Sequence, residues 1–426
     1  MTETVLIITS LRTQWSRTVF QYAMTSNPAR ILGFFAVSFL LFALPSPALA
    51  GGPGEPSSAS VSALTTSVTS TSPYKQAGMW IWYIDSSQGG SVNRIIARAR
   101  NSRIGTLYIK SGDGTNVWSQ FTPALVDRFQ RAGLKVCGWQ YVYGRNPVGE
   151  AKVSAVAKRR GADCFVIDAE TEYEGNYAGA DLYIRKLRKL VGPRFRLSLS
   201  TFPYAHYHPG FPYSVFLGPG AATENLPQVY WKTIGDSVRE AVETTYTYNR
   251  MYERPIYPVG QTYLDPASRE LLLFRRYMLN YGSAPSWWSW QETKATEWST
   301  LGKPLSAGIP GYRKVSVHPT QSRGDRGDQI VWLQQHLYGA GYKVPVTGIF
   351  GSRTVRAVRQ FQASRKLNPD GVVGNRTWNR LLRVQPVRVR WSAAGSSSLQ
   401  AGISLSADGP LSANIPPRRD EIAGAK

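Results

Sequence analysis

Eight short apolar segments alternate with segments of helical pattern over residues 78–294, and this rhythm constrains the fold more than any other feature. Strands separated by helices predict parallel pairing in a single sheet. Several apolar segments lack polar alternation, as strands buried on both faces do. No glycine-rich fingerprint follows the first segment, which argues against a dinucleotide-binding sheet. We therefore expect an α/β protein with a (β/α)8 TIM barrel, and an open doubly wound sheet is the alternative. The expected strands are 78–85, 104–112, 134–144, 162–170, 195–203, 226–234, 255–264 and 285–292.

The N-terminal segment has the features of an export signal. Arg30 precedes an apolar run that ends in the small-residue sequence Ala48-Leu49-Ala50. We predict a signal peptide at 1–50, cleaved after Ala50, because the run is short for a membrane span. An uncleaved anchor is the alternative. The mature protein should be secreted, to the cell wall or periplasm, with no stable membrane span.

Charge and cysteine content narrow the choice of partner. The chain has 50 Lys and Arg against 27 Asp and Glu, a net charge of +23, which favours an anionic partner. Export argues for a cell wall and against nucleic acid. The two cysteines, Cys137 and Cys164, fall in neighbouring expected strands. A bridge across adjacent strands is often strained, so we expect two buried free thiols rather than a disulfide.

Composition divides the rest of the chain. Residues 51–73 are rich in Ser and Thr and have no periodicity, which predicts a flexible linker. Residues 301–321 are expected to form a second linker, and 385–426 a disordered tail. This leaves a barrel domain at 74–300 and a C-terminal domain at 322–384.

Acids occupy every second position at the end of the fourth expected strand: Asp168, Glu170, Glu172 and Glu174. Active sites of barrels lie at the carboxyl ends of the strands, and side chains two residues apart share a face. Crowded carboxylates in a walled pocket raise one pKa, so that a protonated acid stands beside an ionised partner. Glycoside hydrolysis uses such a pair. We therefore predict Asp168 and Glu170 as catalytic, with Glu172 and Glu174 in the following loop.

Further polar and aromatic side chains are expected at the same end of the barrel. Asp85, at the end of the first expected strand, is predicted as a third catalytic acid. Amide and acid groups supply hydrogen bonds, and flat aromatic rings suit stacking on sugars. A purely structural role is the alternative for each. The predicted substrate-binding residues are Tyr83, Asp113, Tyr141, Gln228, Tyr230, Gln261, Trp288, Trp290 and Gln291.

These residues resemble those of the glycoside hydrolase family 25 muramidases. In that family an Asp closes the first strand and Asp-x-Glu closes the fourth, which Asp85, Asp168 and Glu170 match. A Trp-Gln pair on the eighth strand matches Trp290-Gln291. The resemblance implies Glu170 as general acid and Asp168 as electrostatic partner, with help from the substrate's own N-acetyl group. It covers barrel motifs only, so a divergent glycosidase-like family is the alternative.

The segment 203–213 contains two of the chain's four histidines, His206 and His208. A catalytic zinc site needs three protein ligands, and His318 and His336 lie beyond the barrel. We therefore predict no metal and no other cofactor. This shortage also argues against a zinc amidase or peptidase. The segment is expected to be a lid or a wall of the substrate site.

The C-terminal domain contains an internal near-repeat. Residues 347–358 and 370–381 share the pattern Gly-apolar-x-Gly-polar-Arg-Thr. Each predicts a glycine turn, an N-cap (Ser352 or Asn375) and a helix, which makes a compact all-α three-helix domain. The segment 323–383 resembles the peptidoglycan-binding domain found at the ends of secreted wall hydrolases.

The two domains together predict a function. We expect a secreted cell-wall glycoside hydrolase, muramidase-like, that cleaves peptidoglycan-type glycan by carboxylate acid catalysis while its C-terminal domain holds the wall. The alternative is a non-catalytic protein that binds peptidoglycan or another polysaccharide on a barrel scaffold. Residues 318–390 contain 13 Lys and Arg against 3 Asp and Glu, which suits an anionic wall. The alternative is a solvated basic face with no binding role. We expect a monomer.

Overall fold

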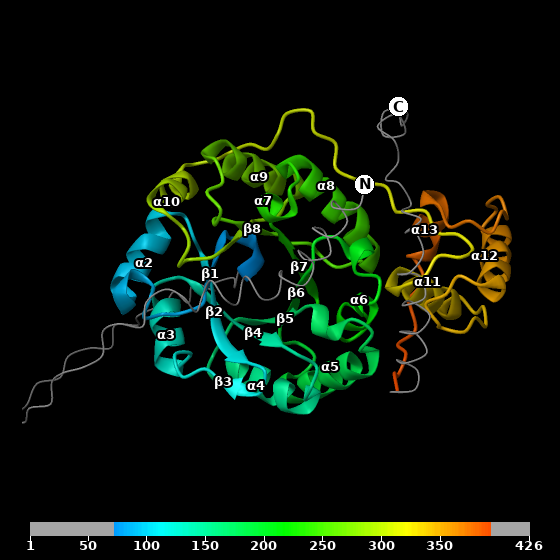
Figure 1. Cartoon of the computed structure of the whole chain (residues 1–426), viewed down its shortest axis with the longest axis horizontal. Coiled ribbons are helices and arrows are strands. Elements are labelled where there is room, and N and C mark those ends of the chain that lie inside the picture. The colour runs from blue at the N-terminus through cyan, green and yellow to red at the C-terminus, as the bar shows by residue number, and fades with distance from the viewer. Residues whose placement is uncertain (1–71, 393–426) are drawn as a thin grey trace, which may run out of the picture. The chain divides into compact units, whose positions relative to one another are not determined.

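The protein's structure, a computed structural model, describes residues 72–392 (Figure 1). The expected signal peptide at 1–50 lies outside the described residues, as do most of the expected linker at 51–73 and the tail beyond residue 392. Within residues 72–392, no helix is both long enough and apolar enough to cross a membrane.

The barrel domain is a closed ring of eight parallel strands surrounded by helices (Figure 1). Pairing of β1 (Gly78–Ile81) with both β2 (Thr106–Asp113) and β9 (Ser286–Trp288) closes the ring. This confirms the (β/α)8 barrel, because an open sheet would leave two unpaired edges. A short extra strand, β3 (Asn116–Val117), pairs antiparallel with the end of β2. The other barrel strands are β4 (Lys135–Val142), β5 (Cys164–Ala169), β6 (Leu197–Thr201), β7 (Glu224–Val229) and β8 (Val259–Gln261).

Helices connect the strands around the outside of the ring (Figure 1). Ser91, Asn146 and Ser237 each cap a helix by accepting a hydrogen bond from the backbone N–H three residues on. The helices are α2 (Val92–Asn101), α3 (Pro123–Arg131), α4 (Pro147–Arg159), α5 (Tyr177–Val191), α6 (Tyr213–Phe216), α7 (Trp231–Ile234), α8 (Val238–Asn249), α9 (Ser268–Tyr281) and α10 (Ala295–Gly302). Single 3-10 turns are η1 (Pro73–Lys75), η2 (Gln88–Gly90), η3 (Thr171–Tyr173), η4 (Ala205–Tyr207) and η5 (Arg250–Tyr252).

All eight barrel strands are shorter than the sequence predicted, and at two of them the chain turns where the prediction continued the strand. β1 ends at Ile81 and not at Asp85, because a turn follows in which the Ser87 N–H donates to the Ile84 carbonyl oxygen at 2.9 Å. The expected strand 226–234 ends early as well, since its last four residues form the helical turn α7. The placement of Asp85 at a strand end was therefore wrong.

Alternate side chains of the strands fill the interior of the barrel. Trp80 and Tyr108 stack there, with their ring centroids 5.0 Å apart. On each strand, the side chains that alternate with these interior ones point outward and pack on the helices. Both faces of each strand are therefore buried. This explains why the strands lack polar alternation. The buried interior residues are Tyr74, Trp80, Tyr108, Cys137, Trp139, Cys164, Val166, Leu226, Tyr230 and Val259.

A disulfide joins β4 to β5 inside the barrel. Cys137 and Cys164 are paired directly in the strand register, are fully buried, and are bonded through their sulfur atoms. Their Cα atoms are 4.6 Å apart, within the range that a disulfide spans. The expectation of two free thiols was wrong, because both side chains point into the interior from directly opposite positions. Structural disulfides are typical of exported proteins.

Removing this disulfide should destabilise the barrel. The two cysteines are separated by 27 residues in the sequence, a loop whose closure is worth ~3.5 kcal/mol in the chain-entropy model. We expect Cys137→Ala/Cys164→Ala to lower the free energy of unfolding by about that amount in urea titrations. Adding a reductant should lower the free energy of unfolding of the wild type towards that of the variant and leave that of the variant unchanged. Equal stability of the two proteins without reductant would contradict the bridge.

The C-terminal domain is the predicted three-helix unit. Its second and third helices are capped by Gly351 and Gly374, one residue before the expected caps Ser352 and Asn375. The side chains of both expected caps therefore lie inside the first helical turn. The helices are α11 (Asp328–Gly339), α12 (Ser352–Ser364) and α13 (Asn375–Leu381).

The sequence repeat has a structural counterpart in two glutamines. Oε1 of Gln334 accepts a hydrogen bond from the Gly348 N–H, and Oε1 of Gln362 accepts one from the Gly371 N–H, each at 2.9 Å. Both glycines have positive φ, 67° and 82°, a conformation that favours glycine. Each helix thus fixes the turn that leads into the next helix.

A buried carboxylate attaches the C-terminal domain to the barrel. Asp328 is 1% exposed and accepts hydrogen bonds from the hydroxyls of Tyr177 and Tyr252, both at 2.9 Å. Ser214 donates to it through both its hydroxyl, at 2.5 Å, and its backbone N–H, at 2.8 Å. The Asp328 N–H in turn donates to the Pro209 carbonyl oxygen at 2.8 Å. The contact therefore uses α5, α6, η5 and the segment 203–213 of the barrel.

The segments on either side of the C-terminal domain also contact their surroundings. Residues 303–320 contain no helix or strand, in line with a linker. The expectation of disorder from residue 385 was wrong for 385–392, because these residues have partners on α5. Arg388 lies 3.5 Å from a carboxylate oxygen of Asp181, and the Trp391 ring centroid lies 4.6 Å from that of Tyr177.

Candidate active site

β5 carries the two predicted acids to the carboxyl end of the barrel. Side chains alternate along the strand, so Asp168 follows Cys164 and Val166 on the interior side, and Glu170 continues that series as the strand ends. Asp168 is 5% exposed, whereas Glu170 is only partly buried. Glu170 is therefore the acid of the pair that solvent and a ligand can reach.

One amide group holds both acids. Nε2 of Gln228, on β7, lies 3.1 Å from Oδ1 of Asp168 and 3.0 Å from Oε1 of Glu170. The same nitrogen lies 3.3 Å from the Ser200 hydroxyl on β6. Because both acid oxygens bond to one nitrogen, they lie within about 6 Å of each other. The structure thus brings together Asp168, Glu170 and Gln228, as the sequence predicted.

Burial raises the pKa of both acids. The pKa of Asp168 is raised first by desolvation and next by the charge of Glu170, while Lys110 opposes the rise. The pKa of Glu170 is also raised first by desolvation; the Gln228 hydrogen bond opposes the rise and the charge of Glu172 adds to it. Two like charges this close together disfavour double ionisation. Both effects favour a state in which the pair retains a proton.

Lys110 is a member of the site that the sequence analysis missed. Its Nζ lies 2.6 Å from Oδ2 of Asp113 and 3.9 and 4.9 Å from the ring centroids of Trp82 and Trp139. The side chain is 1% exposed, and this burial lowers the pKa of Lys110, while Asp113 and then Asp168 raise it. A single lysine at an interior position of an apolar strand was the available signal, because lysine is almost never buried unless it is paired.

Two tyrosines bind the remaining carboxylates of the site. The Tyr141 hydroxyl donates to Oε2 of Glu172 at 2.7 Å, and the Tyr143 hydroxyl donates to Oδ1 of Asp113 at 2.9 Å. Burial, followed by the charges of Glu170 and Glu172, raises the pKa of Tyr141 far above its usual range. Tyr141 therefore stays a neutral hydrogen-bond donor, and Glu172 is held against it.

Aromatic rings line the barrel interior, the side on which the acid pair follows Cys164 and Val166. Tyr230 is 9% exposed, and its pKa is raised by burial, by Tyr263 and by the charges of Asp168 and Glu170. The Trp288 ring centroid lies 5.3 Å from that of Trp139. Of the predicted stacking residues, Tyr83 is the most exposed, at 43%, and it contacts Trp118 at 5.2 Å between centroids.

Four predicted site residues are not brought to the acid pair. Asp85 is exposed in the turn after β1, and within residues 72–392 it forms no hydrogen bond with either acid. Gln261 is fully buried, and its Oε1 accepts from a backbone N–H of α7 at 2.7 Å. Trp290 is 3% exposed and packs on Trp298 of α10, with 4.8 Å between the ring centroids.

Gln291 is the fourth of these residues, and it holds the turn after β1. Its amide nitrogen donates to the Tyr83 carbonyl oxygen at 2.7 Å and lies 2.8 Å from the Ser87 hydroxyl oxygen. Its amide oxygen accepts from the Trp82 N–H at 3.2 Å. Both the oxygen and the nitrogen of the Gln291 amide therefore have hydrogen-bond partners within the protein. The assigned roles of the predicted site residues remain predictions.

The histidine-containing segment 203–213 packs on the barrel. The His206 ring stacks on Tyr248, with centroids 3.6 Å apart, and burial lowers the pKa of His206 to about 4. The His208 ring stacks on Phe202 at 3.4 Å, and its Nδ1 lies 2.6 Å from a carboxylate oxygen of Glu174. The described part of the chain contains no group of three or more His, Cys, Asp or Glu residues arranged to hold a metal ion. The absence of a cofactor remains a prediction.

Comparison with known proteins identifies the C-terminal domain. Residues 326–381 match the family described as "Putative peptidoglycan binding domain". The carboxy-terminal processing protease CtpA of Bacillus subtilis is 32% identical over 81 residues, which are 18% of this chain and 17% of that protein. An uncharacterized protein of Kitasatospora aureofaciens, encoded in the bpoA1 3' region, is 45% identical over 90 residues, which are 20% of this chain and 75% of that protein.

Two solved structures are similar to parts of this chain at low sequence identity. A family 25 glycosyl hydrolase from Bacillus anthracis is 13% identical, with a TM-score of 0.26 over 36% of this chain and 70% of that chain. A GH27 β-L-arabinopyranosidase from Geobacillus stearothermophilus is 8% identical, with a TM-score of 0.36 over 53% of this chain and 74% of that chain. On the sequence matches, the chain belongs to the same family as the Kitasatospora aureofaciens protein, and its residues 326–381 are a peptidoglycan-binding domain.

Proposed function

We propose that the protein is a secreted glycoside hydrolase that cleaves the glycan of peptidoglycan. The observation that carries the proposal is the acid pair Asp168 and Glu170, held by one amide nitrogen of Gln228 at the carboxyl end of the barrel. The same chain carries a peptidoglycan-binding domain at 326–381, which supplies the polymer on which such a pair would act. Holding the polymer raises the local concentration of glycosidic bonds without new chemistry in the barrel.

Glu170 is proposed as the group that protonates the leaving oxygen. It is the more exposed acid, and the pair retains a proton because burial raises both pKa values. Once that proton has left, the negative charge of the pair faces the oxocarbenium-like centre of the sugar. Lys110, paired with Asp113, balances part of this charge from inside the barrel. Gln228 donates to both acids, and the Tyr141 hydroxyl donates to the neighbouring carboxylate of Glu172.

The spacing of the acids bears on stereochemistry. Inverting glycosidases separate their carboxyl groups by about 6.5–9.5 Å to admit a water molecule, and retaining enzymes by about 5–5.5 Å. The oxygens of Asp168 and Glu170 that share Gln228 lie within about 6 Å of each other. We therefore propose that the anomeric configuration is retained through two displacements. The carbonyl oxygen of the substrate's N-acetyl group bonds to the anomeric carbon as the leaving oxygen takes the proton of Glu170, and water then displaces the N-acetyl oxygen and gives its proton to Glu170.

The test is a digest of purified peptidoglycan with the full-length protein. New reducing ends should accumulate, and mass spectrometry of the fragments should identify the glycosidic bond that is cut. Proton NMR should show the retained anomer as the first product. Activity should fall as the pH rises above neutral, because the acid pair then loses its proton. Fragments cut only at peptide bonds would refute the proposal.

A second candidate is a wall-binding protein without catalysis. The observation that favours it is that Trp82, Trp139 and Trp288 contact one another across the barrel, so aromatic rings fill the interior beneath the acids. This protein would sediment with peptidoglycan sacculi and release no reducing ends at any pH.

A further inference from the structure

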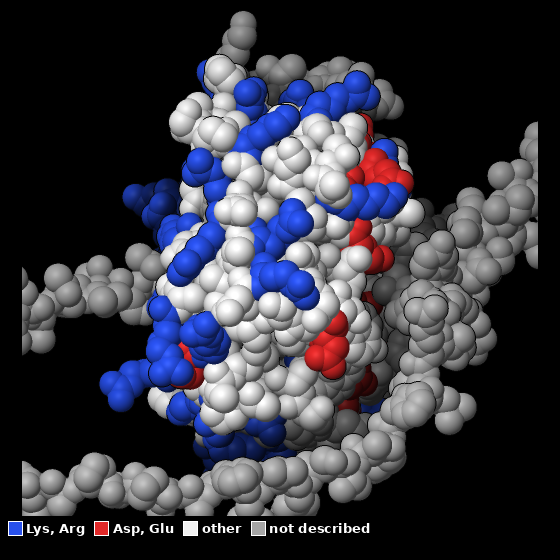
Figure 2. Space-filling view, turned by 90° about the vertical axis from the view of Figure 1, so that its left-hand side faces the viewer, with Lys and Arg blue, Asp and Glu red and all other residues white. Residues whose placement is uncertain are grey.

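A basic face covers the flank of the barrel around α2. Figure 2 shows Lys and Arg side chains spread over the side where α2, α3 and α10 lie in Figure 1, with few Asp and Glu among them. α2 contains Arg94, Arg98 and Arg100 and no acidic residue. One groove runs between α2 and α10, and another between α2 and α3. None of the residues that line these grooves belongs to the candidate active site.

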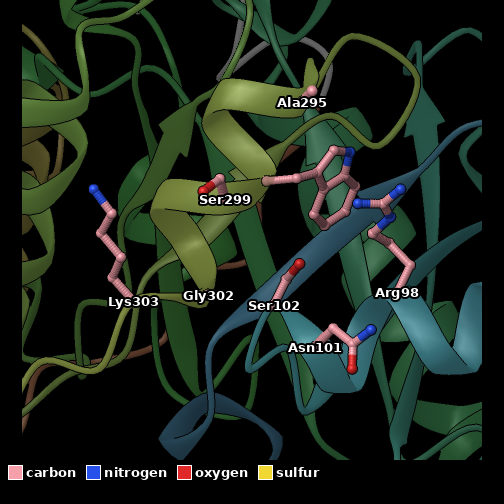
Figure 3. A pocket seen from close by; sticks show the side chains of 8 residues that line it. Arg98, Asn101, Ser102, Ala295, Ser299, Gly302 and Lys303 are labelled. Carbon is pink, nitrogen blue, oxygen red and sulfur yellow. The ribbon is translucent and has the colours of Figure 1, made fainter.

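The groove between α2 and α10 combines cations with hydroxyl groups and an aromatic ring (Figure 3). Its volume is about 380 Å³. The guanidinium carbon of Arg98 lies 5.6 Å from the ring centroid of Trp298, a contact that positions the cation over the ring. The polar and charged residues that line it are Arg98, Asn101, Ser102, Ser299 and Lys303.

The groove between α2 and α3 is the more strongly charged of the two. It has a volume of about 360 Å³, and Arg100 of α2 faces Arg128 and Arg131 of α3 across it. Three guanidinium groups line one groove, although they repel one another. This arrangement concentrates positive potential where an anion can enter.

Neutral groups hold most of these cations in place. Arg94 and Arg100 each donate to a backbone carbonyl oxygen, at 3.1 and 2.6 Å, and Arg128 donates to a side-chain amide oxygen at 2.7 Å. Among the arginines of α2 and α3, only Arg131 forms an ion pair with a carboxylate, that of Asp127. A carbonyl oxygen orients a guanidinium group without neutralising it, so the remaining N–H groups and the positive charge stay available to a ligand.

We propose that this basic flank binds a phosphodiester-linked anionic polymer of the cell wall. Arginine binds phosphate oxygens through two parallel N–H groups, and Arg94 and Arg98 are four residues apart on α2, a rise of ~6 Å. Cations spaced along a helix with a groove on each side suit a chain of repeated anions better than one anion. The peptidoglycan-binding domain of the same chain favours a wall polymer over nucleic acid. This binding goes beyond the proposed hydrolysis and does not depend on it.

The test removes three arginines and measures binding of the full-length protein to two wall preparations. One is a Gram-positive cell wall with its phosphodiester polymers, and the other is the same wall after hydrofluoric acid has removed them. We expect Arg98→Gln/Arg100→Gln/Arg128→Gln to bind the intact wall about tenfold more weakly at low salt. Binding to the stripped wall should match that of the wild type, and the difference on intact wall should shrink as salt rises.

Two further variants and one competitor decide the interpretation. Arg159→Gln/Arg194→Gln/Arg276→Gln removes the same charge from exposed positions elsewhere on the barrel and should bind both walls as the wild type does. Arg98→Lys/Arg100→Lys/Arg128→Lys should retain most of the wild-type binding, which separates loss of charge from loss of folding. The proposal is wrong if the two glutamine variants lose equal binding to the intact wall, or if the first variant loses as much binding to the stripped wall as to the intact one. It is also wrong if duplex DNA competes more strongly than the released wall polymer.

Discussion

Glu170→Gln is expected to lower the rate of glycan cleavage by about 10²–10⁴-fold, the usual contribution of a positioned acid. Glutamine has nearly the same shape and can still accept the hydrogen bond from Nε2 of Gln228, which lies 3.0 Å from the native carboxylate. It cannot supply a proton to the leaving oxygen. The measurement is the initial rate of reducing-end release from purified peptidoglycan, with unchanged thermal unfolding as evidence that the variant folds.

Binding and a distant control make this result specific. The Glu170→Gln variant should sediment with sacculi as the wild type does, because residues 326–381 are untouched. Glu243→Gln removes a carboxylate from α8 that pairs with Arg239, and it should retain full activity. If Glu170→Gln cleaves glycan at the wild-type rate, Glu170 is not the acid. Loss of activity in both variants would point to a general effect of charge.

The alternation of strands and helices in the barrel could be predicted because each strand is buried on both faces. Apolar runs separated by helical patterns leave few other arrangements, and the closed ring confirmed this. The strand ends were less predictable. Apolar character continues past Ile81 and past Val229, yet the chain turns at both places, since local hydrogen bonds in the turns replace the ladder of the sheet.

The acid pair could be predicted from a spacing of two residues on one strand. Gln228 was also predicted, although its bond to both carboxylates depends on β5 and β7 curving towards each other. Lys110 was missed because the three tryptophan rings around it come from β4 and from the segments that follow β1 and β3. The disulfide was rejected on a general rule about strain, whereas the register places the two cysteines directly opposite each other.

The contact between the two domains could not be predicted from local pattern. Asp328 follows Gly327 at the start of a helix, where an acid is expected to be solvated and to complement the helix dipole. Its partners, Tyr177, Ser214 and Tyr252, lie 76 to 151 residues away in the sequence. A linker followed by a small domain is usually interpreted as a flexible tether, and only the three-dimensional structure shows four donors around one carboxylate.

Asp328→Ala is expected to detach the C-terminal domain from the barrel. The substitution leaves four buried donors without their acceptor, two tyrosine hydroxyls and both donors of Ser214. Hydrogen bonds to a charged group contribute about 1.5–3 kcal/mol each to stability, and a buried donor left without an acceptor carries a further desolvation cost. We therefore expect the packing of the two domains to lose at least ~3 kcal/mol of stability. Limited proteolysis should then cut within residues 303–321 much faster than in the wild type, because the linker is no longer held between two packed domains.

Asp328→Asn distinguishes loss of the carboxylate from loss of the side chain. One amide oxygen can still accept the two bonds now made to one carboxylate oxygen, while the amide NH₂ faces the donors on the other side. Its stability should therefore fall between those of the wild type and Asp328→Ala. Asp265→Ala, at an exposed ion pair with Lys294, should leave both the proteolysis rate and the unfolding midpoint nearly unchanged. If all three variants resist proteolysis as the wild type does, the carboxylate does not hold the domains together, and the remaining contacts, among them the bond from Trp332 Nε1 to the Met251 carbonyl oxygen at 2.7 Å, must do so.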